Sequence, residues 1–195
     1  MKERGLIFTR ESIPGLQSGA KTQSRRVVRP QPGPTRLLDH NGTLVEVTDR
    51  GFARWLEESR QRTLRCPYGV PGDLIWVKEA FALLGKQTIY RADKLSQTEG
   101  YSHVIRNGGR WKSPRFMPKV AARIWLELTG VRVERLQNIR AGDVIREGFF
   151  DQEGLGRSKA AFSAIWDELN AKRGFPWESN PWVWVLEFRR CERDA

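Results

Sequence analysis

The chain has 195 residues, a length that suits a single domain, residues 1–195, with one hydrophobic core and room for insertions. Its 34 lysines and arginines outnumber its 23 aspartates and glutamates, which gives a net charge of +11 and an isoelectric point near 10.2. An excess of this size favours a polyanionic partner, nucleic acid above all, because basic groups neutralise phosphates and release counterions.

Several classes of protein receive no support from the sequence. Cys66 and Cys191 lie far apart without metal-ligand spacing, so neither a disulfide framework nor a zinc site is indicated. No apolar run approaches the roughly 20 residues of a membrane span. The apolar run near the N-terminus is too short for the apolar region of a signal sequence. We therefore expect a cytoplasmic protein with no membrane partner, no metal and no cofactor, and we favour a monomer.

The first elements in chain order are a short strand and a short helix. Residues 5–9 are β-prone, residues 10–18 predict a helix, and Gly19 is placed to end it. Residues 21–28 predict a loop that enters a strand and closes before two prolines. The segment 1–36 holds eight basic residues against two acidic ones, which is more than half of the net charge.

The next part of the chain reads as an insertion at about residues 30–65. It has a Pro/Gly-rich entry, a turn signal at residues 40–42 between two short strands, and the spacing of a polar helix over residues 51–65. Residues 66–73 are dense in turn formers and lead into a strongly apolar strand at residues 74–81.

A second insertion at about residues 84–110 predicts one strand at residues 87–91 and a polar, Gly-rich remainder. The longest strand pattern follows over residues 124–133, where apolar residues alternate and Gly130 marks a bulge or bend. We expect Glu79, near the end of the strand predicted over residues 74–81, to pair with an arginine.

The C-terminal part predicts two helices and a buried strand. Residues 136–148 read as a short helix with Asp143 and Glu147 one turn apart on the same side, Asp143 being a helix-start or companion residue. Residues 158–172 carry an apolar stripe typical of a core-facing helix. Residues 181–190 are almost continuously apolar, which predicts a strand covered on both faces.

Aromatic residues near basic ones are candidates for stacking on a base. Trp76 and Trp125 lie on strands, where aromatic residues are more often part of the core. Phe116 and Met117 lie between two prolines, and we expect them to form an exposed pocket edge. The basic residues beside them, Arg115 and Lys119, join the candidates for binding nucleic acid.

Five motifs in order carry a family resemblance: G-x-K-T-x-[ST]-R-R, CPYGxPGDxxWVxE, FMPxxAxR, VRVERLQxIxxxDxxxEG and NPWVWVxEF. Together they resemble the phage and prophage branch of the ASCH domain family, in the PUA-like superfamily, over nearly the whole chain outside the insertions. The resemblance implies an α+β fold, a small mixed β-barrel with flanking helices. It also implies recognition of RNA or of a modified nucleobase, with hydrolysis in some members.

One related group of small ASCH proteins removes the acetyl group from N4-acetylcytidine with a lysine, a threonine and a glutamate. By this resemblance the three positions fall on Lys21, Ser24 and Glu147, and Ser24 keeps the hydroxyl of the threonine. Thr22, Arg25 and Arg26 belong to the same motif and are candidates for binding substrate or nucleic acid.

The three residues make chemical sense for amide hydrolysis. A hydroxyl is a weak nucleophile and needs a base, and a lysine serves as that base only if its pKa falls from about 10.4 toward neutrality. Arg25 and Arg26 would lower the pKa of Lys21, whereas an ionised Glu147 would raise it. The alternative is that Lys21, Arg25 and Arg26 contact phosphates, Ser24 bonds locally, and Glu147 is a surface residue.

Three functions stay open at this point. The first is a metal-free amidohydrolase acting on an N4-acylated cytidine or a similar modified pyrimidine. The second is a non-catalytic module that binds RNA or reads a modified base. The third is a metal-independent ribonuclease that uses the same lysine and hydroxyl against a phosphodiester. Convergence of Lys21, Ser24 and Glu147 in space would favour the enzyme.

Overall fold

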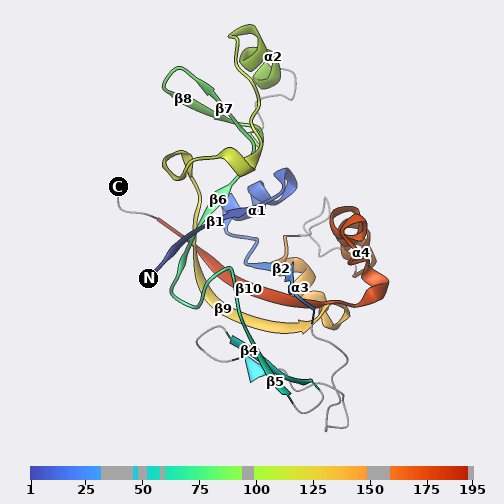
Figure 1. The fold of residues 1–195 in the computed structure, drawn as a ribbon. Helices are drawn as coiled ribbons and strands as arrows, with labels where there is room; N and C mark the ends of the chain where they lie inside the picture. Colours follow the sequence, from blue (N-terminus) through green and yellow to red (C-terminus); the bar gives the residue numbers. More distant parts are fainter. Residues whose placement is uncertain (32–45, 48–51, 58–59, 94–98, 149–158, 193–195) are drawn as a thin grey trace.

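A computed structural model describes residues 1–31, 46–47, 52–57, 60–93, 99–148 and 159–192. Its centre is a five-stranded mixed sheet that contains the longest strands of the chain (Figure 1). In spatial order the strands are β1 (Glu3–Ile7), β6 (Leu74–Lys78), β9 (Trp125–Arg135), β10 (Trp182–Cys191) and β2 (Gln23–Val27). β1 and β6 pair in parallel, and the other neighbours pair antiparallel.

The fold contains both helices and strands, so the predicted α+β class is confirmed. The sheet is not closed into a barrel, because β1 and β2 stand at opposite ends of the strand order. A side chain nevertheless links these two edges: Nη2 of Arg26 donates to the carbonyl of Ile7 at 2.7 Å.

β9 and β10 form the long curved band that positions the other elements (Figure 1). Phe188 pairs with Leu128 and Glu187 pairs with Gly130, so Thr129 is the extra residue of a bulge, as predicted. A Cβ at Gly130 would lie 2.7 Å from a carboxylate oxygen of Glu187, so a larger residue would have to displace the end of that side chain. The bulge bends β9 around its partner strand.

Each face of β10 packs against a different core. Trp184, Leu186 and Phe188 join a cluster with residues of α1 (Ile13–Ser18), whereas Val183 and Val185 join one with residues of α3 (Ala141–Arg146) and α4 (Lys159–Asn170). Residues 182–186 are therefore all buried, which confirms the strand covered on both faces.

The first helical segment follows the sequence pattern closely. A 3-10 turn, η1 (Arg10–Ser12), precedes α1, and Gly19 ends the helix with φ of 77°. That left-handed conformation favours glycine, so the predicted cap is confirmed. Ile13 and Leu16 are fully buried and fix α1 against the main sheet.

The C-terminal helices are shorter than the patterns predicted. The expected helix at 136–148 divides into η4 (Leu136–Asn138) and α3, and α4 matches its stripe except that Leu169 is 42% exposed. The remaining short turns are η2 (Pro114–Phe116), η3 (Lys119–Ala121), η5 (Ala171–Arg173) and η6 (Trp177–Ser179). No helix in the described part of the chain is long and apolar enough to cross a membrane.

The first insertion contains strands where a helix was expected. β4 (Phe52–Glu57) and β5 (Arg60–Arg65) form an antiparallel pair that β3 (Glu46–Val47) extends, so the polar helix predicted over 51–65 is wrong. Pairing between strands satisfies the backbone groups that a helix would satisfy locally, and such tertiary pairing overrides a weak helical spacing. The turn signal at 40–42 lies outside the described residues.

The second insertion begins with a hairpin of β7 (Phe81–Leu84) and β8 (Gln87–Tyr90), which confirms the strand predicted there. The polar remainder forms α2 (Glu99–Arg106), a helix that its glycine-rich sequence concealed. Both elements lie at one end of the molecule, away from β4 and β5 (Figure 1).

A buried ion pair connects the hairpin to the main sheet. Both carboxylate oxygens of Glu79 accept from Arg123, at 2.9 and 3.0 Å, which confirms that Glu79 pairs with an arginine. Arg123 also contacts Asp93 at 2.6 Å, and its guanidinium lies 3.9 Å from the ring centre of Tyr90. Glu79 is almost completely buried, so its carboxylate depends on this partner.

Removal of that charge should loosen the attachment. We expect Glu79→Gln to lower the free energy of unfolding by about 2 kcal/mol, because a buried charge-assisted pair loses its acceptor charge. Glu127→Gln is the matched control, since Glu127 pairs with Arg189 at the surface and should cost less than about 1 kcal/mol. Urea denaturation measures both; equal costs would contradict the anchoring role.

Candidate functional site

Lys21 and Glu147 meet in the interior although 126 positions separate them. Nζ of Lys21 donates to Oε2 of Glu147 at 2.9 Å and to its backbone carbonyl at 2.5 Å. Each residue is only 5% exposed. Lys21 lies just before β2 and Glu147 just after α3, so the contact joins two element ends.

Two glycines make room for the lysine stem. A Cβ at Gly15 or at Gly148 would lie 3.1 Å from Cβ of Lys21, closer than most side chains tolerate. Gly148 also has φ of +83°, which disfavours other residues. The backbone holds the same segment, because the amide of Thr22 donates to the carbonyl of Arg146 at 2.8 Å. The position of Lys21 is thus set by α1 and α3 together.

Arg25 connects Lys21 and Glu147 to a wider set of buried charges. Its Nη1 lies 3.1 Å from Oε1 of Glu147, and its Nη2 lies 2.6 Å from Glu134 and 3.2 Å from Asp143. Arg25 is itself buried, and its planar fork suits several carboxylates at once. One guanidinium therefore holds carboxylates from β9, from α3 and from the residue after α3.

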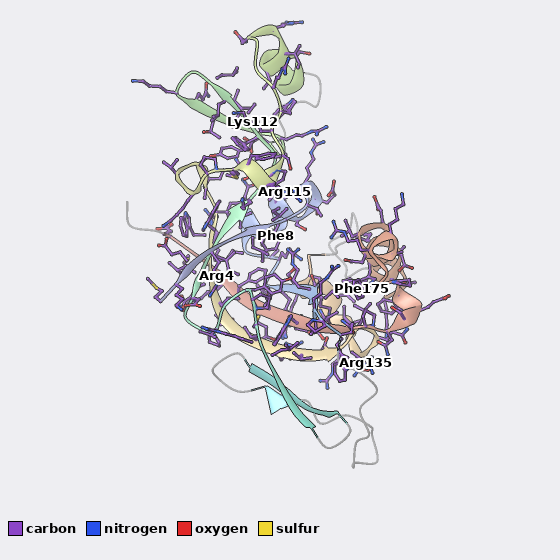
Figure 2. The ribbon with its side chains drawn as sticks, viewed as in Figure 1. Arg4, Phe8, Lys112, Arg115, Arg135 and Phe175 are labelled. Carbon is purple, nitrogen blue, oxygen red and sulfur yellow. The ribbon has the colours of Figure 1, made fainter. Side chains whose placement is uncertain are left out.

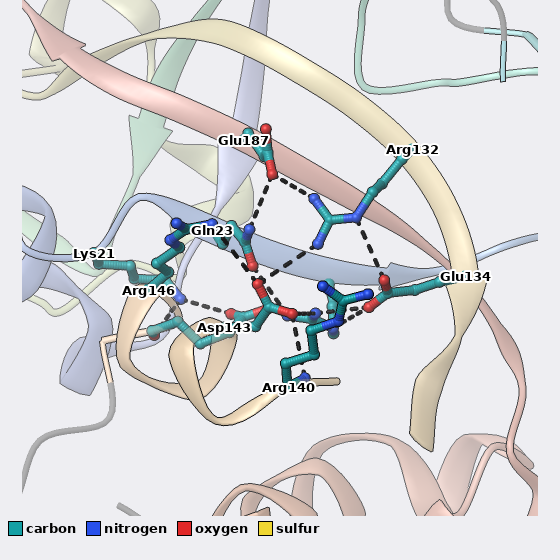
Figure 3. Close-up of polar contacts among 10 residues, drawn as sticks. Lys21, Gln23, Arg132, Glu134, Arg140, Asp143, Arg146 and Glu187 are labelled. Carbon is teal, nitrogen blue, oxygen red and sulfur yellow. Dashed lines mark hydrogen bonds and ion pairs between the residues drawn. The ribbon is translucent and has the colours of Figure 1, made fainter. Parts of the chain in front are cut away.

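The network continues outward through Arg132, which is partly exposed. Arg132 contacts Glu134 at 3.3 Å and Asp143 at 3.7 Å, and it pairs with Glu187 (Figure 3). Gln23 links the inner and outer parts: its Nε2 donates to Glu187 at 3.0 Å, and its Oε1 accepts from Arg25 at 3.3 Å. The charges form one connected group that reaches the surface on the side of Arg132.

Asp143 begins α3 as well as pairing with arginines. Its carboxylate accepts from the amide of Arg140 at 3.2 Å, at the third position of the helix. This confirms the helix-start role expected from the sequence. Burial would raise the pKa of Asp143, but the Arg140 amide, Arg25 and Arg132 outweigh it and lower that pKa below its usual value.

The electrostatics of Lys21 and Glu147 follow from burial and from each other. Burial lowers the pKa of Lys21, with contributions from Arg26 and Arg25, while Glu147 opposes the fall. Burial would raise the pKa of Glu147, but Lys21 and Arg25 together lower it below 4.5. Arg25 thus keeps the Glu147 carboxylate paired whether or not Lys21 carries its proton.

Ser24 points away from these charges. In the β2–β10 ladder Ser24 pairs with Leu186, which faces the α1 core, whereas Arg25 pairs with Val185, which faces α3. Side chains alternate along a strand, so residues three apart, such as Lys21 and Ser24, project to opposite faces. Of the three residues expected to converge, the structure brings two together and turns the hydroxyl to the other face.

The other predicted binding residues of the first motif differ in what they contact. The guanidinium of Arg25 pairs with internal carboxylates. Thr22 contributes its backbone, with its carbonyl accepting from Phe188 at 2.9 Å. Arg26 donates to Ile7, and its guanidinium lies 5.1 Å from the ring centre of Phe8. Arg26 is therefore the residue of the pair that faces the α1 side.

The loop around Phe116 matches the expectation only in part. Phe116 is 71% exposed, but Met117 is 2% exposed, packs with Phe81 and accepts from the amide of Glu79 at 3.2 Å. Met117 is thus core, because the 3-10 turn that ends at Phe116 directs the next side chain inward. Arg115, labelled in Figure 2, is the middle residue of this turn, and its carbonyl accepts from Nζ of Lys78 at 2.8 Å.

Lys119, the last of these candidates, contacts two neighbouring side chains and remains partly exposed. Its amine pairs with Glu3 and lies 5.7 Å from the ring centre of Trp125, which is buried as expected. The amine keeps an exposed side, so it adds to the basic surface around Phe116.

Sequence reasoning missed four members of the network: Gln23, Arg132, Glu134 and Glu187. The available signal was the alternation on β9 and β10, where polar residues two apart interrupt apolar strands. Residues two apart share a face, so Arg132 and Glu134 had to meet whatever packed on that face. Their partners came from distant parts of the chain and could not be named from spacing.

The carboxylates of this site are occupied by cations of the protein. In the described ranges no group of three or more histidine, cysteine, aspartate or glutamate side chains is arranged to hold a metal ion. No protein-family model matches the chain, and neither the curated proteins nor the solved structures contain a match.

Acid should release the inner pair. Because the folded-state pKa of Glu147 lies below its unfolded value, its ionised form adds stability above about pH 4.5, and that stability is lost as the pH falls through the folded pKa. We expect Glu147→Gln to cost about 3–5 kcal/mol at neutral pH, since Lys21 and Arg25 lose a buried partner. The cost should shrink as the pH falls below about 4.5 and through the folded pKa of Glu147.

Urea titrations at several pH values measure this difference. Asp143 titrates in the same sense and remains in both proteins, so it serves as an internal reference. The double variant Lys21→Met with Glu147→Gln should recover part of the loss, because the unpaired ammonium is gone. A pH-independent cost for Glu147→Gln would contradict an ionised Glu147.

Proposed function

We propose that this protein acts on RNA or on a nucleoside derived from it, as a metal-free amidohydrolase of an N4-acylated cytidine or a similar modified pyrimidine. The proposal includes membership of the ASCH domain family and its PUA-like architecture. The observation that carries it is the buried contact of Lys21 with Glu147, in which Arg25 shares the carboxylate.

The contact suits a lysine that gives up its proton. A general base works best when its pKa lies near the operating pH, and burial moves the pKa of Lys21 in that direction. Loss of the proton would normally leave a buried carboxylate unpaired, but Arg25 already contacts Glu147 at 3.1 Å. Titratable groups perturbed in this manner cluster at functional sites.

The proposed step uses water as the nucleophile, since Ser24 faces the α1 core. The neutral amine of Lys21 accepts a proton from water as the water oxygen attacks the acyl carbonyl carbon. The carbon–N4 bond then breaks, and Lys21 returns the proton to N4, giving cytidine and a carboxylic acid. Glu147 orients the Lys21 amine through the 2.9 Å contact.

A second candidate is a non-catalytic module that binds RNA or reads a modified base. One observation favours it: the Lys21 amine donates to a carboxylate and to a carbonyl, both of which favour the protonated ammonium. In that case the pair fastens β2 to the end of α3, and binding falls to surface cations. The net charge of +11 supports an RNA partner under either candidate.

Turnover of N4-acetylcytidine tests the hydrolase. We expect Lys21→Met to lower kcat by about 10²–10⁴-fold, the usual contribution of a general base. Ser24→Ala should retain activity within about threefold, because its hydroxyl lies on the other face of β2. Lys86→Met, at an exposed lysine in the turn between β7 and β8, is the control, and circular dichroism establishes that each variant is folded.

Each other outcome has a distinct meaning. Loss of turnover in Ser24→Ala with Lys21→Met still active would reject the water mechanism. Salt-dependent binding of an acetylated RNA by a parent protein that releases no acetate would establish the non-catalytic module. Shortening of that RNA, with loss in Lys21→Met, would establish the ribonuclease.

A further inference from the structure

Three arginines gather at the free edge of β2 without a carboxylate partner. They are Arg26 on β2, Arg29 just after it, and Arg173 at the end of η5. Within the described ranges none of the three forms an ion pair, although Lys21 and Arg25 of the neighbouring face are surrounded by carboxylates. β2 is the last strand in the order of the main sheet, so no other strand of the described residues pairs along this edge.

Arg26 is the inner member of the group. One nitrogen donates to the Ile7 carbonyl, the guanidinium stacks over Phe8, and Nε is buried without a hydrogen-bond partner among the described residues. A ring face and one carbonyl compensate a buried cation incompletely, because neither carries a negative charge. Burial lowers the pKa of Arg26 and the charge of Arg173 lowers it further, whereas Tyr68 and the more distant Glu147 carboxylate oppose the fall.

Arg29 and Tyr68 extend the group outward. The guanidinium of Arg29 lies 4.8 Å from the ring centre of Phe175, two positions beyond Arg173. Burial raises the pKa of Tyr68, and the charges of Arg26 and Arg29 oppose that rise, so the phenol is within electrostatic reach of both. In Figure 2, Phe8 lies close to α1 and Phe175 close to α4.

We propose that Arg26, Arg29 and Arg173 bind a phosphate group of an RNA strand. Guanidinium groups match the geometry of phosphate oxygens and bind them through paired hydrogen bonds. The rings of Phe8 and Phe175 are covered by Arg26 and Arg29, so they fix the cations and are not free to stack on bases. The ligand chemistry is therefore an anion and not a base.

This site is separate from the Lys21 contact but rests on the proposed RNA-directed function. Lys21 and Arg25 face α3, whereas Arg26 faces the α1 side of the same strand. An RNA strand that passes along the edge of β2 would be held there by its phosphate backbone. The Lys21 contact lies on the opposite face of β2 from that phosphate site. The phosphate site would govern affinity for a strand and leave chemistry on a free nucleoside unchanged.

Binding of a labelled single-stranded RNA at several salt concentrations tests the site. We expect Arg29→Gln and Arg173→Gln each to reduce the slope of log affinity against log salt by about 1, the effect of one lost phosphate contact. Both residues are exposed, so the variants should fold. Arg106→Gln on α2, far from the site, is the matched control and should change the slope much less.

Two further arms separate the sources of phosphate and the two proposals. Cytidine 5′-monophosphate should raise the melting temperature of the parent but not of Arg29→Gln if a single nucleotide phosphate suffices. A rise in the melting temperature with RNA alone would assign the site to an RNA strand.

Arg29→Gln should keep full turnover of free N4-acetylcytidine if the hydrolase exists. If no turnover is found but the salt slopes change as expected, the phosphate site stands and the hydrolase falls. Slopes for Arg29→Gln and Arg173→Gln that match Arg106→Gln would overturn the phosphate site.

Discussion

The Arg25 guanidinium is the interaction on which the inner site depends. It contacts carboxylates of Glu134, Asp143 and Glu147, and so ties β2, β9 and α3 into one charged layer. Among the described residues Arg25 is the cation that contacts all three, whereas Lys21 reaches Glu147 and Arg132 reaches Glu134 and Asp143. Because Arg25 also contacts Glu147, that carboxylate has a cationic partner besides Lys21.

The alternation of β2 separates two kinds of basic chemistry. Residues on the α3 face, Gln23 and Arg25, meet carboxylates, whereas Arg26 on the other face meets the Phe8 ring and the Ile7 carbonyl. The edge strand β2 therefore supplies one arginine to the carboxylates and another, without an ion pair among the described residues, to the other side. The G-x-K-T-x-[ST]-R-R motif reads as one basic patch in sequence but serves two environments in space.

Internal pairing takes up acids and bases together. Glu79, Asp143 and Glu147 are buried, and their partners are Arg123, Arg25 and Lys21. Glu134 and Glu187 pair with Arg25 and Arg132. The net charge of +11 therefore lies on residues outside these contacts.

The sequence by itself determined the elements whose patterns are local and strong: the apolar β10, the glycine-capped α1, the bulge of β9 and the α+β class. It also placed Lys21 and Glu147 in one site through the motif resemblance. Only the tertiary structure decided that residues 52–57 and 60–65 pair as strands, that Met117 is core, and that Ser24 faces away from Lys21. The reason is that strand pairing, burial and the face of a side chain depend on partners distant in the chain, whereas caps, bulges and apolar runs are written in adjacent residues.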